Sequence, residues 1–470
     1  MALESEERPS DVSAILRSAV LEAQEAVAEE VRKLFLALRE EIPANFDKAA
    51  DPSSEGSLCG SMVQMWEIVG GGDKGGIIVR DGETTKSNQL DDRLSTGALV
   101  EEVELKGDRL HYKLVLGTGP PDGWVSTKLK DKDLAVKTDK APVSSPPPTS
   151  VGPKGEAPLP IGLFFPGQGS QYVKMMEKVM DIAAVKEMIE KSKPILGYDI
   201  LEICLNGPED KLEETRYCQP AMFLGGLAGL EKLKQDKPEA VSRASVMAGL
   251  SLGEYTALCA AGVMSFEDGL KLVKLRGEAM QEAATSGAKK QLMLSVAGLE
   301  RAKLDPLCRE AASKEDGGVC SVANCLFPQG FSIGGTEKAI NTLKELAEKN
   351  GALQAKVLKT AGAFHTSLMQ PAQDKLSAAL EETLPNMKPP MHSVWMNASA
   401  QPIRPGTDPK EIVALLKRQL TNPVLWDDSM KAILKEGVNE FYEVGPMKQI
   451  KAMMKRIDAT AWKATTNVEV

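Results

Sequence analysis

This sequence of 470 residues has few cysteines, histidines and aromatic residues, and it has no long apolar run. Its seven cysteines are odd in number and scattered, and no C-x-x-C pair occurs, which disfavours a disulfide framework and a zinc site. Such cysteines favour a reducing compartment, either the cytoplasm or an organelle stroma or matrix. The first ten residues, MALESEERPS, are acidic and lack the apolar core of a secretory signal, so no targeting peptide is visible.

An excess of positive charge is lacking as well. Lys and Arg number 57 against 66 Asp and Glu, which gives a net charge of -9 and argues against a general nucleic-acid-binding protein. The longest uncharged stretch, Gly317–Thr336, is interrupted by asparagine, proline and several glycines, and the apolar run Val246–Phe266 contains Glu254. We therefore expect no membrane span, and the length predicts two or three domains at roughly 150 residues each.

Residues 1–50 and 137–157 differ from the rest of the chain in their residue pattern and composition. Apolar residues recur every three or four positions between Asp11 and Glu40, which predicts an amphipathic helical segment within residues 1–50. Its role, as a short coiled-coil seam or as a helix packed on the protein or a partner, stays open. Residues 137–157 are rich in proline, serine and glycine and are typical of a semi-rigid linker.

Residues 59–136 consist of short apolar runs separated by Gly-rich turns. The alternation of Val103 and Leu105 with acidic residues, the turn at residues 106–108 and the alternation that follows predict a β-hairpin. Five short strands in this span suggest a small barrel, and the step GWV at residues 123–125 resembles the last turn of SH3-like barrels.

Residues 158–465 alternate β-like runs with helical stretches, which predicts an α/β domain with a mainly parallel sheet. Within it, the motif GLSLG at residues 249–253 lies between a β-like run and a helical run. A sharp turn from strand to helix lifts a serine hydroxyl clear of its neighbours, so Ser251 is a candidate nucleophile. The alternative is an ordinary Gly-rich turn with a capping serine.

A serine nucleophile needs a base, and the chain has only three histidines. His111 belongs to the predicted hairpin and His392 to a strand-like run, so we expect structural roles for both. His365, in the motif GAFHTSLM, follows a β-like run at a Gly/Ala-rich turn and is the candidate base. A third motif, FPGQGSQ at residues 165–171, follows another β-like run and is typical of a loop that presents backbone N-H groups to a ligand.

Seven motifs in this order resemble those of malonyl-CoA:acyl-carrier-protein transacylases: FPGQGSQ, YCQPAMF, GLSLGEYTAL, KLVKLRGEAMQ, GAFHTSLM, RQLTNPVLWDDSM and EVGPMKQIKAMMKR. The resemblance covers about 300 of the 470 residues, from Pro160 to about Ile457. It implies a hydrolase-like parallel-sheet core with an inserted ferredoxin-like subdomain at about residues 287–359. It also implies ping-pong transfer of malonyl from malonyl-CoA to the phosphopantetheine thiol of an acyl carrier protein, for fatty acid or polyketide synthesis, with no metal and no bound cofactor.

The resemblance assigns roles to individual residues. Ser251 matches the nucleophile and His365 the base, whose imidazole is oriented by a backbone carbonyl at the position of Gln419. Gln168 and Leu252 match the residues whose N-H groups form the oxyanion hole. A carbonyl is sufficient for orientation, because fixing the tautomer requires only an acceptor for the second ring N-H.

Arg276 matches the arginine that binds the free carboxylate of the acyl group, which a guanidinium holds with two parallel hydrogen bonds. Gln219, Leu250 and Asn324 are pocket candidates, and Leu250 replaces a histidine that is usual in the family. The GAFH motif resembles the form selective for malonyl. Met447 replaces the usual glycine of a VGPGK-like turn.

A carrier protein of this family is acidic, so we expect basic residues near the cleft to contact it. Those residues are Lys271, Lys274, Lys448, Lys451, Lys455 and Arg456. Three other functions remain open: an acyltransferase with a different acyl-CoA donor, a serine esterase or thioesterase that has no use for Arg276, and a non-enzymatic scaffold that tolerates loss of Ser251.

Overall fold

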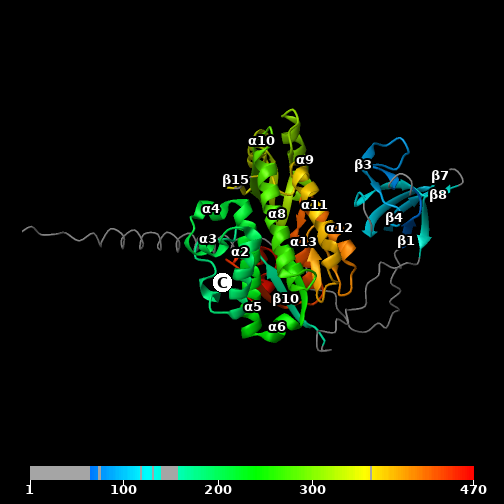
Figure 1. Ribbon diagram of the computed structural model, residues 1–470. Coiled ribbons are helices and arrows are strands. Elements are labelled where there is room, and N and C mark those ends of the chain that lie inside the picture. The colour runs from blue at the N-terminus through cyan, green and yellow to red at the C-terminus, as the bar shows by residue number, and fades with distance from the viewer. Residues whose placement is uncertain (1–63, 72–75, 117–118, 130–131, 139–156, 360–361) are drawn as a thin grey trace, which may run out of the picture. The chain divides into compact units, whose positions relative to one another are not determined.

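The computed structural model describes residues 64–71, 76–116, 119–129, 132–138, 157–359 and 362–470 (Figure 1). The chain divides into two compact units, Met1–Val143 and Ser144–Val470, and each is described by itself. The helical segment predicted within residues 1–50 lies outside the described residues, as does most of the linker predicted at 137–157.

The N-terminal unit contains a seven-stranded sheet in the order β3-β2-β6-β5-β4-β1-β9, in which every pair of neighbours is antiparallel. Its strands, with the separate two-stranded ribbon β7-β8, are β1 (Met65–Ile68), β2 (Ile77–Arg80), β3 (Gln89–Leu94), β4 (Leu99–Lys106), β5 (Arg109–Leu116), β6 (Asp122–Ser126), β7 (Lys128–Leu129), β8 (Lys132–Asp133) and β9 (Ala135–Thr138). The side chains of Trp66, Ile68, Val79, Leu110 and Val125 are among those that form its core.

The predicted hairpin is confirmed, because Lys106 pairs with Arg109 across the turn between β4 and β5. The ladder shifts register between Glu102 and Glu104, and this bulge turns Val103 outward, where it is 47% exposed. Strand β3 was not predicted from the sequence, because its segment QLDDRL is too charged to resemble a strand.

The C-terminal unit is built on a six-stranded sheet in the order β17-β16-β11-β10-β19-β20, parallel throughout except for β17. The strands are β10 (Leu159–Phe165), β11 (Ala244–Gly249), β16 (Ser393–Met396), β17 (Gln401–Ile403), β19 (Glu440–Val444) and β20 (Thr465–Val468). The parallel core therefore confirms the predicted α/β class.

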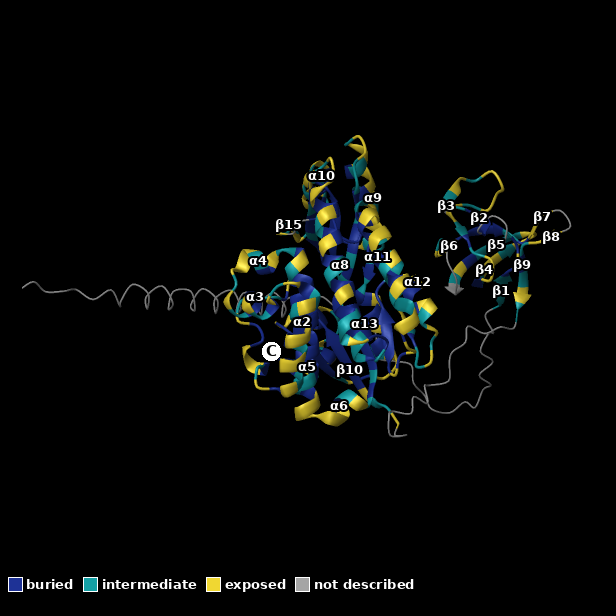
Figure 2. Ribbon diagram, viewed as in Figure 1, coloured by how far each residue is buried: buried dark blue, intermediate teal, exposed yellow. Residues whose placement is uncertain are grey.

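Alternation along β10 sends side chains to the two faces of this sheet. Leu163 and Phe165 join one hydrophobic cluster, whereas Phe164 joins a second cluster with Trp426 and Met430. Helices that contribute to the first cluster are α2 (Ala183–Leu196), α3 (Ile200–Asn206), α4 (Glu209–Glu213), α5 (Thr215–Asp236), α6 (Pro238–Ser242), α7 (Gly253–Ala260), α8 (Phe266–Thr285), α11 (Gln370–Thr383) and α12 (Pro409–Gln419). The second cluster includes α13 (Trp426–Lys435), α14 (Gln449–Ile457) and α15 (Ala459–Lys463), and Figure 2 shows buried strands beneath helices with exposed outer faces.

Between α8 and α11 the chain contributes four strands to a second sheet in the order β15-β12-β14-β13-β18, and β18 joins it from beyond α12. Its strands are β12 (Gln291–Ala297), β13 (Cys320–Phe327), β14 (Gly330–Thr336), β15 (Gln354–Val357) and β18 (Val424–Leu425), and it packs with α9 (Arg301–Ser313) and α10 (Glu337–Lys349) around a core of its own. Two short 3-10 helices, Ser367–Met369 and Leu384–Asn386, flank α11, and a third spans Glu177–Val179.

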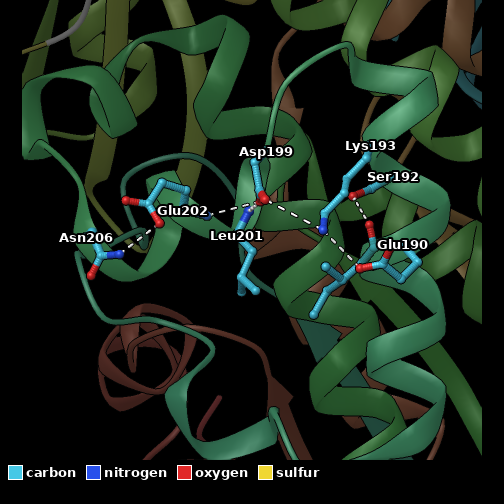
Figure 3. Close-up of polar contacts among 8 residues, drawn as sticks. Glu190, Ser192, Lys193, Asp199, Leu201, Glu202 and Asn206 are labelled. Carbon is cyan, nitrogen blue, oxygen red and sulfur yellow. Dashed lines mark hydrogen bonds and ion pairs between the residues drawn. The ribbon is translucent and has the colours of Figure 1, made fainter.

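Local polar contacts fix the helix ends, as the turn between α2 and α3 illustrates (Figure 3). Asp199 Oδ1 accepts the backbone N-H groups of Leu201 and Glu202 at 3.0 and 3.3 Å, which satisfies two N-H groups at the start of α3. Lys193 near the end of α2 pairs with Glu190 at 2.9 Å. Among the helices of the described residues, none is long and apolar enough to cross a membrane.

Candidate active site

A sharp turn between β11 and α7 holds Ser251 in the left-handed region, with a φ of 54°. The flanking glycines allow this turn. A Cβ on Gly249 would lie 1.8 Å from the carbonyl carbon of Gly253, and one on Gly253 would lie 2.1 Å from the carbonyl oxygen of Phe165. The glycines of the GLSLG motif therefore bring strand, helix and the loop after β10 into contact around the serine.

Ser251 and His365 come together although 114 positions separate them in the sequence. Ser251 Oγ lies 2.8 Å from His365 Nε2, and His365 Nδ1 lies 2.8 Å from the backbone carbonyl oxygen of Gln419. That carbonyl accepts only an N-H, so Nδ1 carries the proton and Nε2 is left to accept the serine hydroxyl proton. Burial, helped by the positive charge of Arg276, lowers the pKa of His365 to about 4, so the imidazole is neutral at pH 7.

Arg276 projects from α8 to the same serine and is only 1% exposed. Its Nη2 donates to Ser251 Oγ at 3.0 Å and to the side-chain oxygen of Gln419 at 2.9 Å, and its Nη1 donates to the side-chain oxygen of Gln219 at 2.8 Å. Burial lowers the pKa of Arg276, and its Nε has no hydrogen-bond partner among the described residues. A buried guanidinium with a donor directed at the candidate nucleophile has the chemistry to bind an anionic group.

Gln168 and Leu252 line the same cavity as Ser251. Leu252 is the N-cap of α7, so its N-H precedes the intrahelical hydrogen bonds of that helix. Gln168 follows Gly167, where a Cβ would lie 2.3 Å from the Leu250 carbonyl oxygen, so the two loops are in close contact. Both backbones border one cavity with Ser251, as a pair of oxyanion donors must.

The cavity above Ser251 has a volume of about 400 Å³. It is lined by Gly167, Gln168, Gly169, Gln219, Leu250, Ser251, Leu252, Arg276, Met280, Met293, Ser295, Asn324, Leu326, Ser332, Leu358, Lys359, Phe364, His365, Gln449 and Met453. All three pocket candidates are on this wall. The described residues that line it include one arginine, Arg276, and one lysine, Lys359, and no acidic residue.

Two buried residues near Ser251 were missed in the sequence analysis. Asn397 accepts the Ser251 N-H at 2.7 Å, and the Glu254 carboxylate accepts the Asn397 N-H at 2.6 Å. Glu254 had a signal, since it is an isolated acid within an apolar run. Asn397 had none, because it reaches the serine only through the pairing of β16 with β11.

The other two histidines are not among the residues that line this cavity. His392 is buried with Nδ1 2.9 Å from the Ala244 carbonyl oxygen, and His111 stacks on Trp124 at 4.9 Å. Six cysteines in the described part of the chain are free, and no group of three or more His, Cys, Asp or Glu side chains there could hold a metal ion.

The six basic residues expected to contact a carrier protein already have partners within the chain. Lys271 pairs with Asp268, Lys274 with the Ile195 carbonyl, Lys448 with Glu469 and Lys451 with the Thr465 carbonyl, while Lys455 lies over Trp462 and Arg456 over Phe327. Most of these contacts are exposed and exchangeable, so docking stays a prediction.

Residues 163–464 match the acyl transferase domain family. The mitochondrial malonyl-CoA-acyl carrier protein transacylase of Homo sapiens is 39% identical over 317 residues, which is 66% of this chain and 80% of that protein. An acyl-carrier-protein-S-malonyltransferase from Bartonella henselae superposes with a TM-score of 0.61 at 32% identity over 66% of this chain and 95% of its own.

A malonyl-transacylase solved in complex with a type II PKS acyl-carrier protein gives a TM-score of 0.59 at 31% identity, over 65% of this chain and 94% of its own. The chain belongs to the acyl transferase domain family and, within it, to the malonyl-CoA-acyl carrier protein transacylases. The predicted family resemblance is thereby confirmed.

Proposed function

We propose that this protein transfers malonyl from malonyl-CoA to the phosphopantetheine thiol of an acyl carrier protein, through an ester on Ser251. One observation carries the proposal: Ser251 Oγ lies between a neutral imidazole at 2.8 Å and the guanidinium of Arg276 at 3.0 Å. The imidazole supplies a base, and the guanidinium supplies the partner for an acyl group that has a free carboxylate. The family membership and the relatives' names support the same activity.

In the first half-reaction Ser251 Oγ attacks the thioester carbonyl and its proton passes to His365 Nε2. The N-H groups of Gln168 and Leu252 stabilise the oxyanion, the C-S bond breaks, and the CoA thiolate leaves with the proton from His365. In the second half-reaction His365 takes the proton of the carrier thiol, the thiolate attacks the ester, and Ser251 recovers its proton. These steps need no metal and no resident cofactor.

Arg276 holds the malonyl carboxylate in both half-reactions. The bound carboxylate takes over the Nη donor that faces Ser251 Oγ in the free enzyme, which releases the hydroxyl for attack. The side-chain oxygens of Gln219 and Gln419 keep the guanidinium in place meanwhile. Leu250 and Asn324 border the acyl group, and an esterase would have no use for a buried arginine at this position.

The finer architecture forms part of the proposal. The inserted sheet has the chain path β-α-β-β-α-β and the strand order β15-β12-β14-β13, which supports a ferredoxin-like subdomain at about residues 287–359. The antiparallel sheet of the N-terminal unit supports an SH3-like barrel at residues 59–136, joined by a linker at 137–157 to a catalytic domain at 158–465. The free buried cysteines are in keeping with a reducing compartment.

Intact-mass measurement after mixing with malonyl-CoA tests the proposal. We expect one malonyl-sized mass increase in the wild-type protein, its loss on addition of a holo acyl carrier protein, and its absence in Ser251→Ala. A malonyl adduct that persists in Ser251→Ala would exclude Ser251 as the acceptor, and hydrolysis faster than transfer to the carrier would favour the esterase alternative.

A further inference from the structure

The backbone around Ser251 is held by one side chain from the neighbouring strand. Asn397 directly follows β16 and is 2% exposed. Its Oδ1 accepts the Ser251 N-H at 2.7 Å, and its Nδ2 donates to the Gly249 carbonyl oxygen at 2.8 Å. The amide of Asn397 therefore bridges the residue that enters the turn and the nucleophile.

This bridge acts on a strained backbone. Ser251 has a φ of 54°, a conformation that a non-glycine residue keeps only where the surroundings over-determine it. A third contact acts on the other side of the residue, because Gln419 Nε2 donates to the Ser251 carbonyl oxygen at 2.9 Å. Both backbone polar groups of Ser251 are thus fixed by side chains from other elements.

The bridge is itself anchored to α7. Glu254, one turn after the serine and 1% exposed, accepts the Asn397 backbone N-H through Oε2 at 2.6 Å. Burial raises the pKa of Glu254 to about 7, and the groups that face it include Gln419 and Arg276. Glu254 therefore holds the backbone of Asn397, and the side chain of Asn397 in turn holds the backbone of the turn at Gly249 and Ser251.

We propose that Asn397 and Glu254 are a pair of positioning residues that hold Ser251 Oγ in line between His365 and Arg276. Because the Ser251 N-H is occupied by Asn397, the oxyanion hole is left to the N-H groups of Leu252 and Gln168. This inference rests on the proposed acyl transfer through Ser251 and assigns to the pair a role in rate rather than in substrate binding.

The test is single-turnover acylation by malonyl-CoA, measured by rapid quench and intact mass over a range of donor concentrations. For Asn397→Ala and Glu254→Ala we expect the maximal rate constant to fall roughly 10- to 100-fold, the loss typical of small misplacements of a reacting group. The half-saturating concentration should change less than about twofold, because the contacts of Arg276 with Gln219 and Gln419 remain. Glu254→Gln, which keeps an acceptor oxygen, should recover at least about a third of the wild-type rate constant.

Asn467→Ala is the matched control. Asn467 lies in β20 of the same sheet, and neither polar atom of its side chain has a hydrogen-bond partner among the described residues. The rate constant of Asn467→Ala should therefore match that of the wild type. Asn397→Asp keeps an oxygen for the Ser251 N-H and loses the donor to Gly249, and it replaces Asn397→Ala in the test if the alanine variant does not fold. We expect at least a tenfold lower rate constant for it as well.

Two results would overturn the inference: a folded Asn397 variant that acylates within twofold of the wild type, or a Glu254→Gln variant as slow as Glu254→Ala. A rise in the half-saturating donor concentration as large as the fall in the maximal rate constant would also contradict the inference, because a general distortion of the cavity changes both quantities. A wild-type protein that forms no malonyl adduct contradicts the proposed function instead, so the two failures are distinct.

Discussion

Arg276 Nη2 donates a hydrogen bond of 3.0 Å to Ser251 Oγ, which places a buried cation directly against the candidate nucleophile. In an ordinary serine hydrolase such a cation would hinder attack of the serine on a neutral ester, because it holds a lone pair of the serine oxygen. Here its donors can pass to the carboxylate of a malonyl group. The relationship therefore links acyl selectivity to the release of the nucleophile, and it predicts a change in selectivity when the arginine is removed.

Arg276→Ala should lower malonyl transfer much more than acetyl transfer. Loss of a charge-assisted contact to a buried carboxylate costs about 2 to 5 kcal/mol, or roughly 30- to 4,000-fold in kcat/KM. Acetyl-CoA has no carboxylate, so its use should hold steady or rise. The measurement is competition between the two donors for one carrier protein, with Arg216→Ala on α5 as the control. An equal fall for both donors would mean that Arg276 supports the fold or binds the CoA moiety.

The acylation rate should be insensitive to pH over a wide range. The pKa of His365 is lowered to about 4, so the imidazole stays an unprotonated base as the pH falls from 8 to about 5. At lower pH, protonation removes the base, and the rate constant should decline with a midpoint near pH 4. A solvent-exposed histidine would instead give a midpoint near pH 6.5.

The pH profile needs one further variant, because burial raises the pKa of Glu254 to about 7. The measurement is the rate constant of single-turnover acylation at saturating malonyl-CoA as a function of pH, for the wild type and for Glu254→Gln. A change that disappears in Glu254→Gln is due to Glu254, and one that remains is due to His365. A midpoint near 6.5 that persists in Glu254→Gln would contradict the neutral, buried state of His365.

Gly249→Ala should be severely destabilising. The added Cβ would lie 1.8 Å from the Gly253 carbonyl carbon, a backbone atom that has no freedom to withdraw. We expect a loss of about 3 kcal/mol or more in the free energy of unfolding, at the upper end of overpacking effects, or an insoluble protein. Gly287→Ala is the control, because its nearest atoms lie at 3.5 Å or beyond. Chemical denaturation measures both, and equal stabilities would contradict the described turn.

A protein that begins at Ala157 should fold and transfer malonyl. Every residue that lines the cavity lies within Ser144–Val470, which forms a compact unit with its own cores. The measurements are the thermal midpoint and the rate of transfer to a carrier protein, compared with the full chain. A soluble, monodisperse but inactive product would show that the N-terminal unit is part of the catalytic machinery.

Lys359→Ala should weaken the use of malonyl-CoA modestly. Among the described residues that line the cavity, Lys359 is the only lysine or arginine besides Arg276. An exposed contact with a phosphate of the donor is worth about 0.2 to 1 kcal/mol, so KM should rise roughly 1.4- to 5-fold. A malonyl thioester of N-acetylcysteamine, which has no phosphate, is the control substrate, and an equal loss for both would contradict the contact.

Much of the catalytic unit could be predicted because local patterns determine it. Apolar runs such as IGLFF and SVMAG mark the strands of the parallel sheet, and the glycines around Ser251 mark the turn that follows one of them. Local patterns did not reveal strand β3, because its segment QLDDRL is too charged to resemble a strand. The bulge beside Val103 and the charged strand β3 depend on pairing with other strands, which period-two alternation does not reveal.

The sequence by itself determined the α/β class, the motif around Ser251 and, because histidines are so few, the identity of the candidate base. Only the tertiary structure decided how these residues meet: the Gln419 carbonyl at His365, the guanidinium of Arg276 at Ser251, and Asn397 across the turn. The physical reason is that each contact is a hydrogen bond of about 3 Å between elements far apart in the chain. Its geometry is fixed by strand order and helix packing rather than by any local preference of the residues themselves.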